Sequence, residues 1–132
     1  TIGNKTMTKP TTDEKVALHV KAFIANDSSH RNSMFHSVGN TDIQKCDEGI
    51  ISVFVNDERI LIMETSQDKQ SGFRPTSSMA VKRLNAIKEA LRLEFDLAWI
   101  KGKPHALNGK GNYVLLDKPE YSANELSNIT YS

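Results

Sequence analysis

The stretch Gly49–Thr65, GIISVFVNDERILIMET, decides the class of fold because it carries the clearest β signal in the chain. Two runs rich in β-branched and apolar residues flank the short polar segment Asn56–Glu58. This pattern is typical of a β-hairpin, in which a tight turn joins two antiparallel strands. Because most positions of both runs are apolar, the sequence predicts that both faces of this hairpin are largely covered.

Upstream of the hairpin, a helix is predicted to begin just after Pro10. Thr11 and Glu14 stand three residues apart, as the two partners of a capping box do at a helix start. Apolar residues then recur at helical spacing as far as Ile24, and the polar residues 26–29 end the helix. The next stretch is ambiguous and allows one short strand over Met34–Val38.

Downstream, residues 77–98 are predicted to form one long helix, because apolar side chains repeat along them at helical spacing. The stripe expected to face the core consists of Val81, Leu84, Ile87, Leu91, Phe95 and Ala98. The solvent side alternates in charge, which suits pairs along the helix, such as Arg92 with Asp96, better than phosphate binding. A second apolar line is either buried or meets a protein partner. It consists of Met79, Ala86, Ala90, Leu93 and Leu97, of which Met79, Leu93 and Leu97 are the candidate partner contacts.

The last β signal is a second hairpin, with strands at 99–101 and 112–116 joined by a loop rich in Gly and Lys. The element order predicts a small single α+β domain. Its antiparallel sheet consists of the hairpins 50–65 and 99–116, packed against the N-terminal helix and the helix 77–98. We expect a flexible segment over 1–10, the domain over 11–118, and a polar C-terminal tail over 119–132. Within this tail, Ser122 and Glu125 could cap one short turn.

Length and composition are those of an ordinary globular protein. The 132 residues fit one domain, and 38% are hydrophobic while 25% are charged. No apolar run approaches the roughly 18 residues that a membrane span needs. The lone Cys46 excludes an internal disulfide framework and fits a reducing compartment, so the sequence predicts a cytoplasmic protein.

The basic residues gather in one block, although the net charge of the chain is only +1. Residues 73–110 hold 8 Lys and Arg against 3 Asp and Glu. At the start of this block, Arg74 precedes the hydroxyls of Thr76 and Ser77. Such groups and the free N–H groups of a helix start could hold an anion. A simple helix cap explains the two hydroxyls as well.

The second hairpin is the stronger candidate for nucleic-acid contact. Its loop supplies positive charge, and its two flanking aromatic side chains could stack on bases. The residues concerned are Lys101, Lys103, His105 and Lys110, flanked by Trp99 and Tyr113. The alternative is that Gly and Lys are ordinary hairpin-tip residues and that both aromatic side chains belong to the core.

Catalysis has one candidate, a metal-independent nuclease using His30 and His36, since general acid and base chemistry suits pKa values near neutrality. The polar loop around them explains the same residues. No His or Cys spacing is that of a metal site, so neither a metal nor a cofactor is predicted.

The sequence therefore favours a non-catalytic binding or accessory protein that contacts nucleic acid. The main alternative is a protein-interaction module, or an inhibitor of a larger enzyme, acting through the apolar line of the helix or a sheet edge. Self-association is compatible with either.

Overall fold

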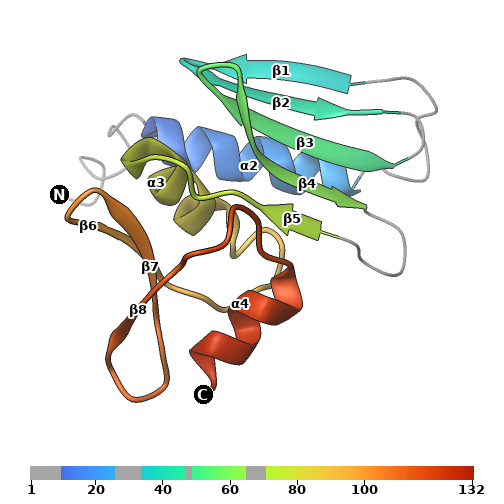
Figure 1. The fold of residues 1–132 in the computed structure, drawn as a ribbon. Coiled ribbons are helices and arrows are strands. Elements are labelled where there is room, and N and C mark those ends of the chain that lie inside the picture. The colour runs from blue at the N-terminus through green and yellow to red at the C-terminus, as the bar shows by residue number, and fades with distance from the viewer. Residues whose placement is uncertain (1–9, 26–33, 47–48, 65–70) are drawn as a thin grey trace, which may run out of the picture.

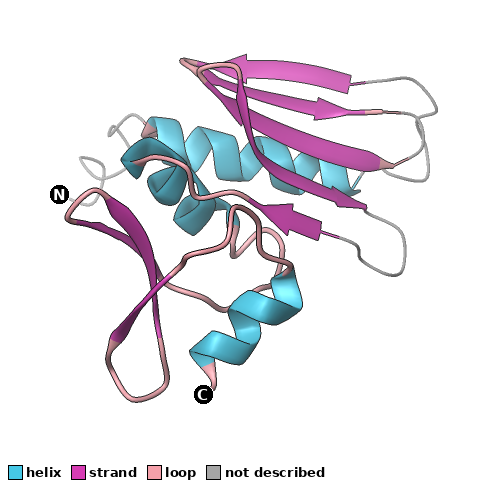
Figure 2. Ribbon diagram, in the orientation of Figure 1, coloured by secondary structure: helices cyan, strands magenta, loops and turns pink. Residues whose placement is uncertain are grey.

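The computed structural model describes residues 10–25, 34–46, 49–64 and 71–132. Within these residues the chain forms three helices and two antiparallel sheets, so the predicted α+β class is confirmed (Figures 1 and 2). The elements are α2 (Thr12–Ala25), β1 (Met34–Val38), β2 (Thr41–Lys45), β3 (Ile50–Val55), β4 (Glu58–Glu64), β5 (Ser71–Phe73), α3 (Ser78–Ile87), β6 (Leu97–Ile100), β7 (Lys103–Leu107), β8 (Tyr113–Leu115) and α4 (Ala123–Thr130). The segment predicted to be flexible, 1–10, lies outside the described residues except for Pro10.

The larger sheet has the strand order β1-β2-β3-β4-β5. The hairpin predicted from Gly49–Thr65 is confirmed as β3 and β4, and the strand predicted over Met34–Val38 is β1. A two-residue turn joins β3 to β4, and its residues Asn56 and Asp57 have φ values of 51° and 67°. Asn and Asp tolerate this left-handed conformation better than most residues, which makes them suitable for a tight hairpin.

The helices α2 and α3 lie against one face of this sheet (Figure 1). The predicted capping box starts α2, because the Glu14 amide donates to Thr11 Oγ1 at 3.2 Å and the Thr11 amide donates to Glu14 Oε1 at 3.1 Å. At its other end, the buried Lys45 ammonium of β2 donates to the Phe23 carbonyl at 2.8 Å. This bond satisfies a last-turn carbonyl that has no partner within the helix.

The prediction of one helix over 77–98 is wrong in its second half. Ser77 caps α3, which ends at Ile87, and residues 88–92 form turns. Arg92 adopts a left-handed conformation with φ of 57°, the Leu93 amide bonds to the Lys88 carbonyl, and the Arg92 amide bonds to the Glu89 carbonyl. These two bonds form the Schellman closure that usually has glycine at the left-handed position. The apolar period then changes from 3.6 to 2, and the chain enters β6.

The smaller sheet has the order β6-β7-β8 and differs in layout from the predicted hairpin 99–116. Lys101 and Gly102 form a tight turn, with φ values of 52° and 77°, directly after β6. Residues 103–107, predicted as part of a loop, therefore form the central strand β7. The next turn is shaped by Asn108, whose side-chain oxygen accepts from the amides of Lys110 and Asn112 at 2.9 and 3.0 Å.

The segment 119–132, expected as a polar tail, contains the helix α4. Ser122 and Glu125 form the complete capping box, and Leu126 of this helix is buried. Before the helix, Tyr121 exchanges two backbone hydrogen bonds with Phe73 of β5. Phe73 also meets Phe95 edge to face, with ring centroids 5.5 Å apart. One hydrophobic core therefore continues from the larger sheet to the segment that leads into the smaller one.

Candidate functional site

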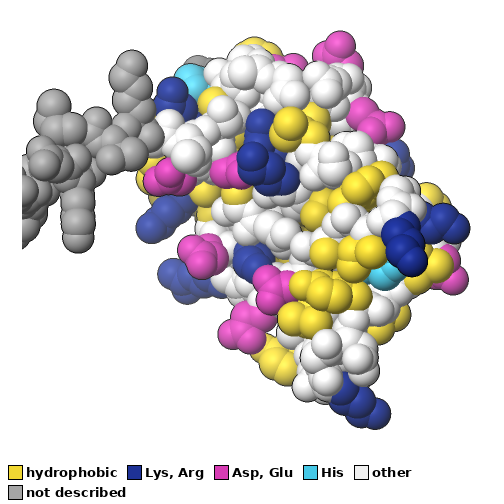
Figure 3. Space-filling model, turned by 90° about the vertical axis from the view of Figure 1, so that its left-hand side faces the viewer, with side chains coloured by type: hydrophobic (Ala, Val, Ile, Leu, Met, Phe, Trp, Pro, Cys, Tyr) yellow, Lys and Arg dark blue, Asp and Glu magenta, His cyan; other side chains and the backbone are white. Residues whose placement is uncertain are grey.

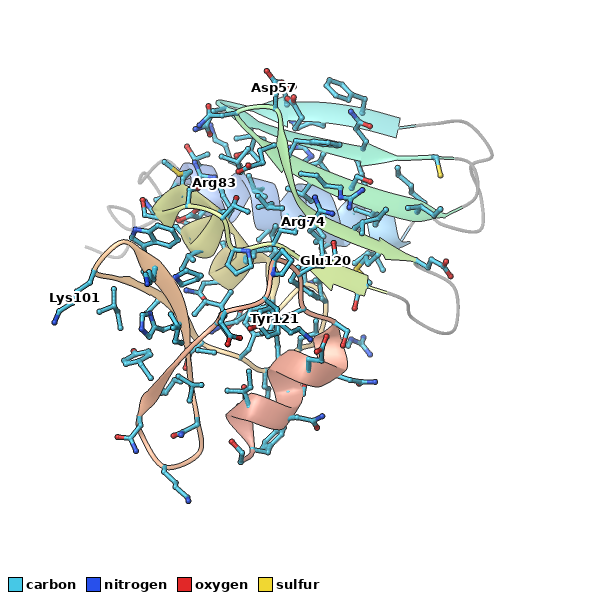
Figure 4. All side chains as sticks on the ribbon, in the orientation of Figure 1. Asp57, Arg74, Arg83, Lys101, Glu120 and Tyr121 are labelled. Atoms are coloured by element: carbon cyan, nitrogen blue, oxygen red, sulfur yellow. The ribbon has the colours of Figure 1, made fainter. Side chains whose placement is uncertain are left out.

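Arg74, predicted as an anion contact, is already engaged by an acidic side chain. Its Nε donates to Glu120 Oε1 at 2.8 Å, and the guanidinium of Arg59 lies 3.6 Å from the same oxygen. Gly72 permits this approach, since a Cβ at that position would lie 2.6 Å from the Glu120 carboxyl carbon. Figure 4 shows Arg74 and Glu120 together near the middle of the molecule, far from Lys101 at the tip of the β6–β7 hairpin.

The start of α3 is likewise occupied by side chains of the protein itself. Ser77 Oγ accepts from the Ala80 amide at 3.1 Å, as in an ordinary cap. The Thr76 hydroxyl donates to Glu58, which places a carboxylate beside the helix start. The hydroxyls of Thr76 and Ser77 are therefore engaged within the protein, as the simple helix cap predicted. Arg74 and the lysines of the second hairpin lie apart and do not form one basic surface.

The apolar line predicted on the long helix divides among different environments, because the helix ends early. Leu97 is buried in β6, where the side-chain amide of Asn85 bonds to its N–H and its C=O at 2.9 and 2.8 Å. Met79 and Leu93 are partly buried and pack against the core. The two bonds of Asn85 fasten β6 to α3.

The remaining two members of that line, Ala86 and Ala90, border a groove of about 440 Å³ with α2. Across the groove, Ala17 and the exposed Leu18 supply apolar surface. Charged side chains of both signs surround it: Glu14, Lys21, Glu89 and Arg92. The groove thus has a narrow apolar floor without a net charge that would select one kind of partner.

A buried guanidinium that sequence reasoning missed ties three elements together. Arg83 Nε donates to Thr41 Oγ1 at 3.0 Å, and its other nitrogens contact Asp13 and Asn40. These bonds join α3 to the start of α2 and to the β1–β2 turn. At helical spacing its neighbours are Met79, Ala80, Ala86 and Ile87, so a lone charge on an apolar face was the available sequence signal of its burial. Its partners satisfy it, so we assign Arg83 to structure.

The histidine pair proposed for catalysis is not brought together within the described residues, because His30 lies outside them. His36 of β1 instead stacks on His19 of α2, with ring centroids 3.6 Å apart. Burial lowers the pKa of His19, and the neighbouring His36 lowers it further. Among the residues that the structure describes, no group of three or more His, Cys, Asp and Glu side chains is placed to hold a metal ion.

The strand register shows which side chains of the smaller sheet share a face. Leu97 and Ala106 are directly opposite each other and both buried, so they mark the face turned to the core. The opposite face, which we name the outer face, alternates with them along each strand. It carries Ala98, Ile100, Lys103, His105, Leu107, Tyr113 and Leu115.

The outer face is largely apolar and partly open, since Ala98, Ile100 and Leu107 are half-buried whereas the β8 residues are exposed. Tyr113 and Leu115 are 50% and 44% exposed. The five apolar residues of this face are absent from the hydrophobic core and from the residues packed against it. Figure 3 looks at the molecule from this side and shows hydrophobic side chains gathered in a band, with Lys and Arg side chains near its margin.

Charge on this sheet has one sign. No Asp or Glu occurs between Leu97 and Leu116, whereas Lys101 and Lys103 stand at one end of the strands and Lys110 at the other. The preceding acidic residue, Asp96, pairs with Lys88 at 2.6 Å. The sheet therefore presents an apolar centre between basic ends.

The two aromatic residues predicted to stack on bases lie on opposite faces of the sheet. Trp99 is opposite Pro104, and Tyr113 is opposite Leu107. Positions 104 and 107 of the same strand point in opposite directions because their separation is odd. Trp99 packs against the core, which leaves Tyr113 as the aromatic side chain of the outer face.

Comparison with known proteins identifies no relative: no family model, curated protein or solved structure matches the chain. A separate finding concerns membranes. Among the described helices, none is both long and apolar enough to cross one.

Proposed function

We propose that the chain is a non-catalytic accessory protein that binds another protein through the outer face of β6–β8. The observation that carries this proposal is the apolar composition of that face together with the exposure of Tyr113 and Leu115. A sheet face that only meets water normally carries polar residues at alternate positions. Contiguous exposed apolar surface rimmed by polar residues is instead typical of interaction sites.

The composition of the face favours a protein over a nucleic acid. Strands of nucleic acid bind to grooves of continuous positive charge with several aromatic platforms for the bases. Here the centre is mainly aliphatic, the lysines stand at the ends, and Tyr113 and His105 are the two rings on the face. Apolar centres with polar rims are the arrangement of protein interfaces.

The test compares two charge insertions at exposed apolar residues. Leu115→Glu disrupts the outer face, whereas Phe35→Glu alters the 62%-exposed Phe35 on β1 of the other sheet. Peptides selected from a random displayed library against the wild-type protein serve as probes, and fluorescence anisotropy gives their affinity. We expect Leu115→Glu to weaken binding at least about tenfold, the effect of losing roughly 1.4 kcal/mol of interface energy. Phe35→Glu should leave binding unchanged.

The same variants test the competing ligand class. Labelled single-stranded DNA, duplex DNA and RNA are titrated at about 50 and 200 mM salt, because phosphate binding weakens steeply over this range. Salt-sensitive binding that Leu115→Glu abolishes would assign the outer face to nucleic acid. Failure to select peptides, or selection of peptides that bind both variants equally, would also overturn the proposal.

A further inference from the structure

We infer that β8 accepts one extended segment of the partner protein, which adds to the smaller sheet as a fourth strand and carries acidic residues at its ends. This inference rests on the proposed protein-binding function and deepens it. It concerns the free edge of the sheet and the charge at its ends, which the outer face alone does not determine.

The hydrogen-bond pattern shows where the backbone of β8 points. The Leu116 amide donates to the Pro104 carbonyl at 2.9 Å, and the Asn108 amide donates to the Asn112 carbonyl at 2.8 Å. In an antiparallel pair the bonded positions alternate. Residues 112, 114 and 116 therefore face β7, whereas the N–H and C=O groups of Tyr113 and Leu115 point to the open side of the sheet.

Within the described part of the chain, no element pairs with that open side. β8 stands at the end of the strand order, and Tyr113 and Leu115 make no backbone hydrogen bond outside their own ladder. Native edge strands are usually protected by charge, proline or a bulge. The residues of β8 are Tyr, Val and Leu, and the β7–β8 register is regular.

The side chains of β8 would also contact an added strand, in addition to the backbone hydrogen bonds. A strand added next to β8 would place every second side chain beside Tyr113 and Leu115, continuing the outer face. Backbone pairing supplies affinity in such strand addition, and alternate side chains supply specificity. Because β8 spans only three residues, pairing alone is weak. The partner segment therefore needs apolar residues at these alternate positions.

The charges at the two ends determine which occupant fits. Lys110 precedes β8, and Lys101 and Lys103 lie toward its other end. At that end the Asp117 carboxylate accepts a hydrogen bond from the neutral Tyr121 hydroxyl at 3.4 Å and keeps its charge, while Lys118 is paired with Glu125. Lys101 and Lys103 therefore outnumber the one free carboxylate there. Among the described residues, no acidic side chain pairs with Lys101, Lys103 or Lys110. Both ends of the edge thus have a positive excess, which acidic residues of a partner would complement.

The same charges disfavour a second copy of this chain. Two β8 strands paired antiparallel would bring Lys110 of each copy to the end of the other where Lys101 and Lys103 outnumber Asp117. Parallel pairing would bring Lys110 to Lys110. Either arrangement brings together ends with a positive excess, and like charges across an interface are unfavourable.

The experiment uses a synthetic nine-residue peptide with alternating Val and Thr at its centre and two Glu at each end. One control peptide replaces the Glu residues with Lys, and a second carries N-methyl groups on the amides that would face β8. We expect the acidic peptide to bind at least about tenfold more tightly than the Lys peptide at low salt, with a smaller difference at high salt. N-methylation should abolish binding, and the peptide should slow exchange of the Tyr113 and Leu115 amides with solvent.

A matched pair of variants separates backbone from side chain. Leu115→Pro removes an N–H that points away from β7, so the ladder of the sheet is retained, and circular dichroism checks the fold. Leu115→Ala removes the side chain and keeps this N–H. We expect Leu115→Pro to weaken peptide binding clearly more than Leu115→Ala does.

The possible failures are distinguishable from failure of the proposed function. Equal binding by both Leu115 variants, or by the N-methylated peptide, would overturn strand addition, while library peptides sensitive to Leu115→Glu would still support the binding function. Binding of the Lys peptide as tightly as the acidic one would overturn the acidic occupant. A dimer in sedimentation that Leu115→Pro dissociates would assign the edge to a second copy. Failure of both the acidic and the library peptides would overturn the inference and the proposed function.

Discussion

The outward faces of the two sheets differ in residue composition. On the larger sheet, the face away from α2 and α3 carries Ser37, Asp42, Gln44 and Ser52 between apolar side chains such as Phe35. The outer face of the smaller sheet carries five apolar residues, one histidine and one lysine. Polar residues at alternate positions keep a sheet face compatible with water. The comparison therefore supports the proposal that the smaller sheet binds a partner, whereas the larger sheet carries much of the core.

The largest expected effect tests this comparison with the same substitution on each sheet. Leu61 of β4 is buried in the core, and Leu115 of β8 is exposed. We expect Leu61→Ala to lower the free energy of unfolding by about 2 to 5 kcal/mol, through lost burial and the cavity left behind. Leu115→Ala should change it by less than about 0.5 kcal/mol. Urea unfolding measures both, and a similar loss in the two variants would show that the outer face is covered.

A second pair tests how the larger sheet is fastened to its helices. Arg83 and Lys82 approach the same Asp13 carboxylate, but their side chains are 6% and 66% exposed. Arg83→Leu should lower the free energy of unfolding by about 1 to 3 kcal/mol, because Thr41 and Asp13 lose a buried partner. Lys82→Leu should change it by less than about 0.5 kcal/mol, as exposed ion pairs do. Equal effects in urea unfolding would contradict the structural role assigned to Arg83.

Acid should weaken the contact between α2 and β1. Burial and the neighbouring His36 lower the pKa of His19 below its ordinary value of 6.5. The unfolded chain therefore takes up this proton at a higher pH than the folded chain does. The contribution to stability is constant above about pH 6.5 and is lost as the pH falls toward the lowered pKa.

Thermal unfolding between pH 7.5 and 5 measures this effect. The melting temperature of the wild-type protein should fall across the range, and His19→Gln should fall less. A wild-type slope that His19→Gln leaves unchanged would assign the acid sensitivity to other groups.

The sequence was sufficient for the local signals and insufficient for the contacts between distant residues. Apolar runs beside Asn56 and Asp57 located the first hairpin, and Thr11 and Glu14 located the start of α2. The partners of Arg83 could not be predicted, since they are 42 and 70 residues away along the chain. Tertiary contacts of this kind override local patterns.

The sequence located the residues of the candidate surface but did not predict how the sheet arranges them. The sequence pointed to residues 99–113 because lysines and aromatic residues gather there. It could not separate Trp99 from Tyr113, because their faces depend on the turn at Lys101 and Gly102 and on the register of β7. Because residues 103–107 were predicted to be a loop, the sequence did not reveal the strand alternation that places Ile100, Leu107 and Leu115 on one face.

The smallest expected effect concerns the point where the chain leaves α3 for the smaller sheet. Arg92 holds the left-handed conformation that ends the helical turns, with φ of 57°, and this is where the prediction of a helix to residue 98 failed. A side chain with a Cβ is strained there by about 1 kcal/mol, whereas glycine is not. Arg92→Gly should therefore raise the free energy of unfolding by roughly 0.5 to 1 kcal/mol, although glycine also gains freedom in the unfolded chain.

The matched control is Glu89→Gly, three residues earlier, where φ is not positive. Glycine there brings only its entropic cost, so the free energy of unfolding should fall by about 0.5 to 1 kcal/mol. If urea unfolding shows that Arg92→Gly raises the free energy of unfolding and Glu89→Gly lowers it, arginine is strained in the left-handed conformation that ends the helical turns. If both glycines destabilise the protein, the turn is instead held by contacts of the Arg92 side chain. The boundary between the two sheets would then depend on that side chain, and replacing it should also perturb the docking of β6 on α3 through Asn85.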